Sequence, residues 1–335
     1  MTIKKLCKHG NEKKFKNLLK TPMNPNKTPM TKMMGKFIFG SRKERRPSYP
    51  IKTGDFNAKK FTNSKKGLGI AWFGHSTVLI NIEGRIIITD PVLSGKSVGP
   101  SRLPGSKPFD YSRTFLANDM PEIDIVLLSH NHYDHLDKIT ISLLLKKANA
   151  FFAPKNVGKW LEKYGIEADR ITEFEWYQEM ERDDFNYTFT PSRHFSGRGA
   201  LSSNTSLWGS WVIKGKDHSV FFSGDGGYSP EFMKIGDRYG PFDLSLIECG
   251  AYSRDWKLIH LLPEESVQAC LDLKSKMAMP IHWGKFNLAY HAWLEPIQRF
   301  SKAANNNNLP FMAPQIGQTI NTPFEPKNWW EGAEL

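Results

Sequence analysis

The sequence predicts an α/β fold in which two β-sheets pack face to face beneath outer layers of helices. Two observations carry this prediction. Short runs rich in Ile and Val occur in both halves of the chain, and segments of helical length follow them. A third observation, a change of charge near residue 67, divides the 335-residue chain into a basic N-terminal arm, residues 1–66, and a single folded domain, residues 67–335.

The first half of the domain begins with three short strands, two of which are joined by a Glu83-Gly84 hairpin turn. A continuous apolar run follows, as expected for a strand that is buried on both faces, and two helices come after it. These strands are predicted at residues 68–73, 77–82, 85–89 and 123–128, and the helices at residues 139–147 and 155–164.

The second half repeats the pattern. Strands are predicted at residues 187–190, 210–214, 219–222, 244–248 and 279–282. A helix is expected to begin at Pro263, with Glu264 and Glu265 in its first turn, where the helix dipole favours negative charge. Residues 305–308, four consecutive asparagines, are expected to form a polar loop.

The positive charge of the chain is concentrated in the arm. The whole chain has a net charge of +12, but residues 1–66 hold 19 Lys/Arg and three acids, a net of +16. Residues 67–335 hold the remaining 27 Lys/Arg and 31 Asp/Glu, a net of −4. A protein that binds nucleic acid with its folded surface would not divide its charge in this way, so nucleic acid is not the expected partner.

Composition also predicts the compartment. There is no stretch of ~20 uninterrupted apolar residues, so no transmembrane helix is expected, and the basic start lacks the apolar region of a secretory signal. Cys7, Cys249 and Cys270 are too few and too scattered for a disulfide framework or a zinc ribbon. A cytoplasmic protein is therefore expected.

The arm itself allows two interpretations. Five prolines lie among its lysines, and its one apolar run covers residues 33–39, which argues against an independent fold. It is either a leader that packs loosely on the domain or a contact for anionic lipid headgroups, which would make the protein peripheral at a membrane.

The strongest chemical signal follows the predicted strand at residues 123–128. It is the segment Ser129-His130-Asn131-His132-Tyr133-Asp134-His135. Extended residues two apart point to the same side, so His130 and His132 can bind one cation together. Asp134 and His135 come after the turn and can face a second cation. Imidazole and carboxylate are the ligands of Zn²⁺ and similar first-row metals.

The remaining ligands must come from distant segments. His194, Asp225 and His282 each lie near the end of a predicted strand, beside small residues that let backbones approach closely. With them the ligands are enough for two sites, and Asp225 is the natural bridge because a carboxylate has one oxygen for each ion. Two divalent metal ions are therefore expected, Zn²⁺ first, with Mn²⁺ or Fe as alternatives.

This set of motifs resembles the metallo-β-lactamase superfamily and, more closely, the family of N-acyl-phosphatidylethanolamine-hydrolysing phospholipase D. The resemblance extends from about residue 67 to residue 293. Its further motifs lie at residues 72–77, 89–91, 224–228, 240–244, 250–252, 260–265 and 281–284. Ile247-Glu248-Cys249 departs from the more apolar segment expected there.

The resemblance implies a four-layered αββα sandwich with the site at one edge, between the sheets. It assigns ligands to both ions: His130, His132 and His194 to the first, Asp134, His135 and His282 to the second, and Asp225 to both. The β-lactamases proper have a Cys ligand in place of Asp225, so lactam hydrolysis is not expected.

The implied activity is that of a phospholipase D-type phosphodiesterase that acts on N-acyl-phosphatidylethanolamine-like lipids. A metal-bridging hydroxide would attack phosphorus. Catalytic roles fall to Asp134 and to His260, which would contact the phosphate or protonate the leaving group. Asp90 either supports a metal ligand or is a turn aspartate. His75 either supports a metal ligand or is a packed histidine.

Other functions are compatible with the same residues. A lactonase or phospho-sugar hydrolase is the alternative on this fold, a nuclease is a third enzyme class, and a membrane- or RNA-tethering protein with a vestigial metal site is the non-enzyme alternative. An apolar groove beside the metals would favour a lipid, whereas a small polar pocket with an Arg would favour a lactone-phosphate. The sequence does not predict an oligomeric state.

Overall fold

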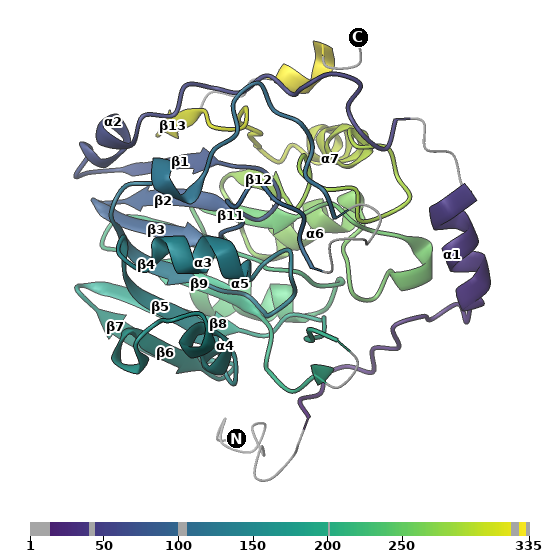
Figure 1. The fold of residues 1–335 in the computed structure, drawn as a ribbon, viewed down its shortest axis with the longest axis horizontal. Helices are drawn as coiled ribbons and strands as arrows, with labels where there is room; N and C mark the ends of the chain where they lie inside the picture. The colour runs from purple at the N-terminus through teal and green to yellow at the C-terminus, as the bar shows by residue number, and fades with distance from the viewer. Residues whose placement is uncertain (1–13, 40–43, 100–105, 200–201, 323–327, 333–335) are drawn as a thin grey trace.

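The computed structural model describes residues 14–39, 44–99, 106–199, 202–322 and 328–332. Its strands form two sheets, one mainly from the first half of the chain and one from the second half (Figure 1). Helices cover the outer faces of the sheets, so the predicted αββα sandwich is confirmed.

The first sheet has seven strands in the order β13-β1-β2-β3-β4-β5-β6, and β3 to β6 run parallel. Its strands are β1 (Leu68–Trp72), β2 (Val78–Ile82), β3 (Arg85–Thr89), β4 (Ile123–Leu127), β5 (Ala148–Pro154), β6 (Ile171–Phe174) and β13 (Thr319–Asn321). All residues of β4 except Asp124 are buried, in agreement with its apolar sequence.

The second sheet has six strands in the order β12-β11-β10-β9-β8-β7, with β10, β11 and β12 parallel. Its strands are β7 (Gln178–Arg182), β8 (Phe185–Thr190), β9 (Ser210–Lys214), β10 (Ser219–Phe222), β11 (Leu244–Glu248) and β12 (Ala278–Ile281). The inner faces of the two sheets meet through aromatic side chains. The ring of Trp211 in the second sheet lies 4.8 Å from Phe174 and 6.3 Å from Phe152, both in the first.

The helices divide between the two outer faces. On the side of the first sheet lie α3 (Lys138–Leu144) and α4 (Gly158–Lys163) (Figure 1). Against the second sheet pack α5 (Glu231–Tyr239), α6 (Pro263–Asp272) and α7 (Glu295–Asn306), whose apolar residues share one buried cluster with Phe221 and Ile247. The two remaining helices, α1 (Met30–Phe39) and α2 (Ala58–Thr62), precede β1.

The basic arm is tied to the domain by its apolar side chains. Phe15, Ile51, Phe56 and Phe61 are buried in the same core as the first sheet. The change of charge near residue 67 therefore does not coincide with an edge of the core. In contrast, α1 stands away from both sheets at the edge of the molecule (Figure 1). The side chains of Met34, Phe37, Ile38 and Phe39 lie outside what the structure describes.

The predicted strands are present with ends shifted by at most two residues, and α6 begins at Pro263 as expected. The prediction of a polar loop at residues 305–308 is wrong in its first half, because α7 continues to Asn306. Burial of Ile297, Phe300 and Ala304 on one face of α7 stabilises the helix despite the poor helix propensity of Asn.

Four strands were not predicted: β5, β6, β7 and β13. Strand β7 is an edge strand whose residues are mostly exposed and lack apolar alternation. Two further observations concern the expected compartment. Among the described residues, no helix has the length and apolar character needed to span a bilayer. Cys249 and Cys270 are buried free thiols, and Cys7 lies outside the described residues.

Candidate metal centre

Seven strands end at the same edge of the sandwich, and each delivers a polar side chain to it. The ends of β3, β4, β10, β11 and β12 carry Asp90, His130, Asp225, Glu248 and His282 within a few residues, and the segments after β1 and β8 carry His75 and His194. The carboxyl ends of parallel strands lie at one edge of a sheet, which explains how residues far apart in the chain meet. All seven predicted ligands converge here.

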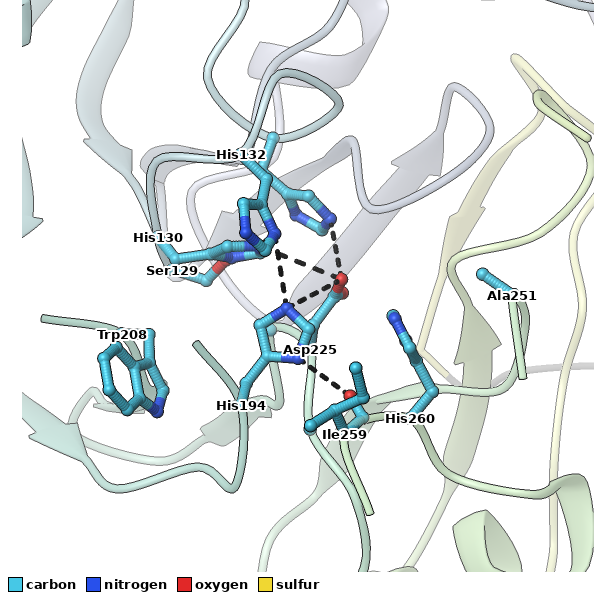
Figure 2. Close-up of polar contacts among 12 residues, drawn as sticks. Ser129, His130, His132, His194, Trp208, Asp225, Ala251, Ile259 and His260 are labelled. Atoms are coloured by element: carbon cyan, nitrogen blue, oxygen red, sulfur yellow. Dashed lines mark hydrogen bonds and ion pairs between the residues drawn. The ribbon is translucent and has the colours of Figure 1, made fainter. Parts of the chain in front are cut away.

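The first three predicted ligands form one group. His130 Nε2 lies 2.8 Å from His132 Nδ1, and His194 Nε2 lies 3.3 Å from the same atom. Figure 2 shows the three rings pointing toward one another and toward Asp225. These three nitrogens can therefore bind a single cation.

The second group lies next to it. His135 Nε2 and His282 Nε2 are 3.2 Å apart, and Asp134 Oδ2 lies 3.6 Å from the first and 3.8 Å from the second. His75 Nε2 donates to the same Asp134 oxygen at 3.0 Å. His75 thus holds the Asp134 carboxylate in place. Support of a ligand was one of the two alternatives expected for His75.

Asp225 lies between the groups. Its Oδ2 is 3.1 Å from both His135 Nε2 and His282 Nε2, and 3.9 and 3.8 Å from the Nε2 atoms of His130 and His194. Its Oδ1 is buried without a hydrogen-bond partner. An orphaned carboxylate oxygen amid converging imidazole nitrogens is costly in a protein interior unless a cation binds there. The donor set therefore fits two bridged divalent metals.

In three of the histidines, the ring nitrogen that faces away from the group has a partner of its own, as is typical of metal ligands. His130 Nδ1 lies 2.8 Å from Ser129 Oγ, and His194 Nδ1 donates to the Ile259 carbonyl at 2.8 Å (Figure 2). His135 Nδ1 lies 2.6 Å from Asp90 Oδ2. These contacts fix each ring so that its other nitrogen faces the group.

Asp90 serves both groups. Its Oδ2 contacts His135 directly and accepts a hydrogen bond from Ser129 Oγ at 2.5 Å, so it reaches His130 through that hydroxyl. Asp90, His75 and His282 all have positive φ angles, 34°, 55° and 67°. Such angles are uncommon for residues other than glycine and are concentrated at functional sites.

The two groups differ in electrostatics. Burial lowers the pKa of His130 and His132 well below the ordinary value and lowers the pKa of His194 to about 3. Burial also opposes protonation of His282, but Asp225 and Asp134 outweigh it and raise its pKa to about 10. For His135 the same carboxylates outweigh burial and raise the pKa well above the ordinary value.

The predicted catalytic residue His260 lies beside the metal groups, 5.1 Å from the His194 ring and 5.5 Å from the His282 ring. Its Nδ1 contacts Oε1 of Glu248, a residue whose role was not recognised in the sequence. The only signal in the sequence is a charged residue at the end of a mostly apolar strand. Tertiary packing alone reveals its partner.

The arm also reaches the site. Asn17 clamps the backbone of His194: its Nδ2 donates to the His194 carbonyl at 2.7 Å, and its Oδ1 accepts the His194 N–H at 3.1 Å. The same Oδ1 accepts the Trp208 indole N–H at 3.2 Å. A second attachment joins Thr28 and Lys36 to the Asp255 carboxylate at 2.7 and 2.9 Å.

A cavity of about 420 Å³ opens over the two groups. Its floor contains His132, Asp134, His194, Asp225, His260 and His282. Its walls are mainly apolar, and two of the wall residues, Met23 and Met33, belong to the arm. None of the described residues that line this cavity is an arginine.

Comparisons with known proteins agree with the architecture. The family profile of the beta-lactamase superfamily domain matches residues 85–283. An uncharacterised protein of Mycobacterium tuberculosis is 41% identical over 291 residues, which cover 85% of this chain and 77% of that protein. The N-acyl-phosphatidylethanolamine-hydrolyzing phospholipase D 1 of Caenorhabditis elegans is 34% identical, with 75% of this chain and 72% of the relative covered.

Solved structures share the fold at low sequence identity. A metallo hydrolase from the archaeon Ignicoccus hospitalis superposes with a TM-score of 0.56 at 19% identity, and the match covers 78% of this chain and all of that one. At this identity the likeness concerns the fold alone.

Proposed function

This chain belongs to the beta-lactamase superfamily, in the family of N-acyl-phosphatidylethanolamine-hydrolysing phospholipase D, and from that premise we propose that it is a binuclear, metal-dependent phosphodiesterase. Its substrates would be N-acyl-phosphatidylethanolamine-like lipids, and its products an N-acylethanolamine and phosphatidic acid. Membership of the superfamily itself makes the chain a metal-dependent hydrolase.

The observation that carries the proposal is the cavity. A floor of imidazoles and carboxylates suits a charged phosphodiester at a metal pair, whereas the walls suit an acyl chain. The apolar wall residues include Met23, Met33, Phe195, Trp256 and Leu288. A lactone-phosphate or phospho-sugar would need polar or cationic groups in those walls, so the lipid is favoured.

In this proposal His130, His132 and His194 hold one ion, Asp134, His135 and His282 hold the other, and Asp225 bridges them. Bound divalent cations supply Lewis-acid polarisation of a phosphoryl oxygen and activation of water for attack on phosphorus. The protein contributes fixed ligand geometry, since the outward ring nitrogens of His130, His135 and His194 are already hydrogen-bonded. Zn²⁺ remains the first choice for this donor set, with Mn²⁺ or Fe as alternatives.

His260 is proposed as the general acid. Its ring lines the cavity, and the Nδ1 edge faces Glu248 beneath it, so Nε2 is the atom left to face the substrate. When the phosphorus–oxygen bond to the leaving alcohol breaks, a proton from Nε2 would pass to that oxygen. Asp134, whose carboxylate His75 holds at the cavity floor, is proposed to act through the second ion.

The arm is proposed to place the cavity mouth against an anionic lipid surface. Leu18, Leu19 and Met23 are exposed by 42%, 40% and 46%, and Met23 also lines the cavity. The exposed Lys14, Lys20 and Lys27 flank them in the chain. A lysine near an anionic bilayer contributes up to ~1 kcal/mol, and exposed apolar residues add burial in the interface.

The activity is tested by a screen of phosphodiesters that differ in headgroup, with added Zn²⁺ or Mn²⁺. We expect hydrolysis of N-acyl-phosphatidylethanolamine with release of phosphatidic acid, and no turnover by Asp225→Ala. Hydrolysis of lactones or phospho-sugars without any lipid hydrolysis would refute the proposed substrate class.

The lipid contact is tested by sedimentation with vesicles of phosphatidylglycerol. Because Asn17 clamps His194, truncating the arm would disturb the metal centre, so point variants are preferable. Replacing Leu18 and Leu19 by Ser should reduce vesicle binding. The matched control replaces Met233 and Leu271, exposed apolar residues of α5 and α6, and should bind normally. Equal binding by both variants would exclude this surface.

A further inference from the structure

Glu248 is a fully buried carboxylate at the last position of β11, a strand of sequence Leu-Ser-Leu-Ile-Glu. Burying an ionisable group in the interior costs several kcal/mol unless hydrogen bonds or ion pairs compensate. An apolar side chain would suffice for packing at the end of a core strand. The contacts of Glu248 must therefore explain its presence.

Each carboxylate oxygen has a separate partner. Oε2 accepts the backbone N–H of Gly226 at 2.7 Å, next to the bridging residue Asp225. Oε1 contacts His260 Nδ1 and lies 3.7 Å from His282 Nδ1. His260 Nδ1 has no other hydrogen-bond partner among the described residues, so this oxygen is the one that holds the Nδ1 edge of the imidazole ring.

The position of Glu248 relative to the metal centre is also informative. It approaches His282 from the side of Nδ1, whereas the Nε2 atom of His282 faces Asp225 at 3.1 Å. Glu248 thus lies behind the ligands, on the side away from the cavity. This placement joins it to His260 and keeps it on the Nδ1 side of His282, although its carboxylate still lies within 4.8 Å of a ligand atom of Asp225.

We propose that Glu248 is the positioning residue of His260, an inference that rests on the proposed function of the site. The carboxylate accepts the Nδ1–H of the imidazole and so leaves Nε2 as the atom that carries and releases a proton in the cavity. The arrangement follows the same logic as the carboxylate that orients the histidine of a hydrolase triad.

The proton balance is simple. For the transfer to balance, Nε2 of His260 carries a proton before bond cleavage, while the Nδ1–H of the same ring is bound by Glu248. The Nε2 proton goes to the oxygen of the leaving alcohol as the phosphorus–oxygen bond breaks. The ring is left neutral with its Nδ1–H still bound to Glu248, in the tautomer that can be protonated again at Nε2.

The central experiment is a double-mutant cycle on the metal-loaded enzyme. Glu248→Gln keeps the size and one acceptor oxygen, but it removes the charge and replaces the other oxygen by an amide NH2 group. We expect kcat to fall about 10- to 100-fold, part of the ~10²–10⁴ that a general acid supplies, with KM and metal content unchanged. In a His260→Ala background the same substitution should have no further effect, because its target is gone.

A second readout does not depend on turnover. Nitrogen NMR of ring-labelled histidine should show the proton of neutral His260 on Nδ1 in the wild type, and a loss of that preference in Glu248→Gln. Ser245→Ala, a buried substitution in the same strand, is the control and should leave the His260 spectrum and kcat unchanged.

The outcomes separate the possible failures. Equal losses from Glu248→Gln in both backgrounds, or loss of metal in that variant, would show that Glu248 acts on the metal centre and would overturn the inference. A proton on Nε2 in the wild type would overturn it as well. If His260→Ala alone keeps full activity, the proposed general acid is wrong, whereas the tautomer measurement still decides the Glu248 contact.

Discussion

The two halves of the metal centre are built differently. His130, His132 and His194 are supported mainly by neutral groups, a serine hydroxyl and the Ile259 carbonyl, and burial lowers the pKa of each ring. The second half, with Asp134, His135 and His282, is surrounded by carboxylates, and the pKa values of its two histidines are raised. Negative charge is therefore concentrated at one half of the site.

This difference indicates what each half depends on. The second half includes charged carboxylates. It also has a rigid support in the core, because Asp90 is fully buried and lies at the end of β3. The first half takes one ligand, His194, from a loop whose backbone is clamped by Asn17 of the arm. We therefore expect charge-removing substitutions to act on the second ion and arm substitutions to act on the first.

The largest effect is expected from Asp225→Ala, which removes the side chain common to both halves. Elemental analysis should fall from two metal equivalents per chain toward none, and turnover should fall to background. His282→Ala is the matched comparison, because it should mainly weaken the second ion. Retention of both ions by Asp225→Ala would contradict the bridging role.

The next largest effect is expected from Asp90 and Ser129, the residues that hold the outward nitrogens of the histidine ligands. Asp90→Asn weakens the contact to His135 and should lower affinity for the second ion by about 10- to 100-fold. Ser129→Ala removes only the hydroxyl that links Asp90 to His130, so its smaller loss should fall on the first ion. Metal titrations monitored by calorimetry measure both. Equal losses at both ions in each variant would show that the halves are not separable.

A smaller effect is expected from Asn17→Ala. The substitution removes both hydrogen bonds to the His194 backbone, so the first ion should be held several-fold more weakly while the second is unaffected. Asn26→Ala, which removes another arm contact, to the carbonyl of Arg254, is the control. Unchanged affinity in Asn17→Ala would mean that the loop carries His194 correctly without the arm.

The smallest effect concerns the stability of the fold and a lysine that lies beside the second half of the metal centre. Lys285 Nζ donates to the Phe73 and Val92 carbonyls at 3.0 and 2.7 Å, next to the loops that carry His75 and Asp90. Burial lowers the pKa of Lys285 to about 7, below the value of 10.5 expected in the unfolded chain. The unfolded state therefore binds more protons between these values, so the Lys285 contribution to stability should rise with pH from about 7 to 10.

Denaturant titrations from pH 7 to pH 10 test this dependence. The free energy of unfolding of the wild type should rise relative to that of Lys285→Met across this range. Lys302→Met, at an exposed position of α7, should follow the wild type. Parallel curves for all three proteins would show that Lys285 does not titrate in this range.

Much of the site could be predicted from particular residues. The segment from His130 to His135 is recognisable because its ligands are close in sequence and their spacing places them on one side of an extended chain. His194, Asp225 and His282 could be found because they follow strands whose apolar sequences are clear. Strands β5, β6, β7 and β13 and helices α5 and α7 escaped prediction. Of these, β7 and the end of α7 have no periodic apolar pattern that reaches their ends.

The sequence by itself determined the sandwich and the identity of the seven converging residues, since local patterns of burial and spacing encode both. Only the tertiary structure decided the contacts between segments that are far apart in the chain. Asn17 meets His194 across 177 positions, and Met23 and Met33 form part of the cavity wall. Packing likewise decided that Glu248 of β11 meets His260 in the loop before α6. The physical reason is that such contacts depend on how strands and loops pack in three dimensions, and no local pattern in the sequence encodes that packing.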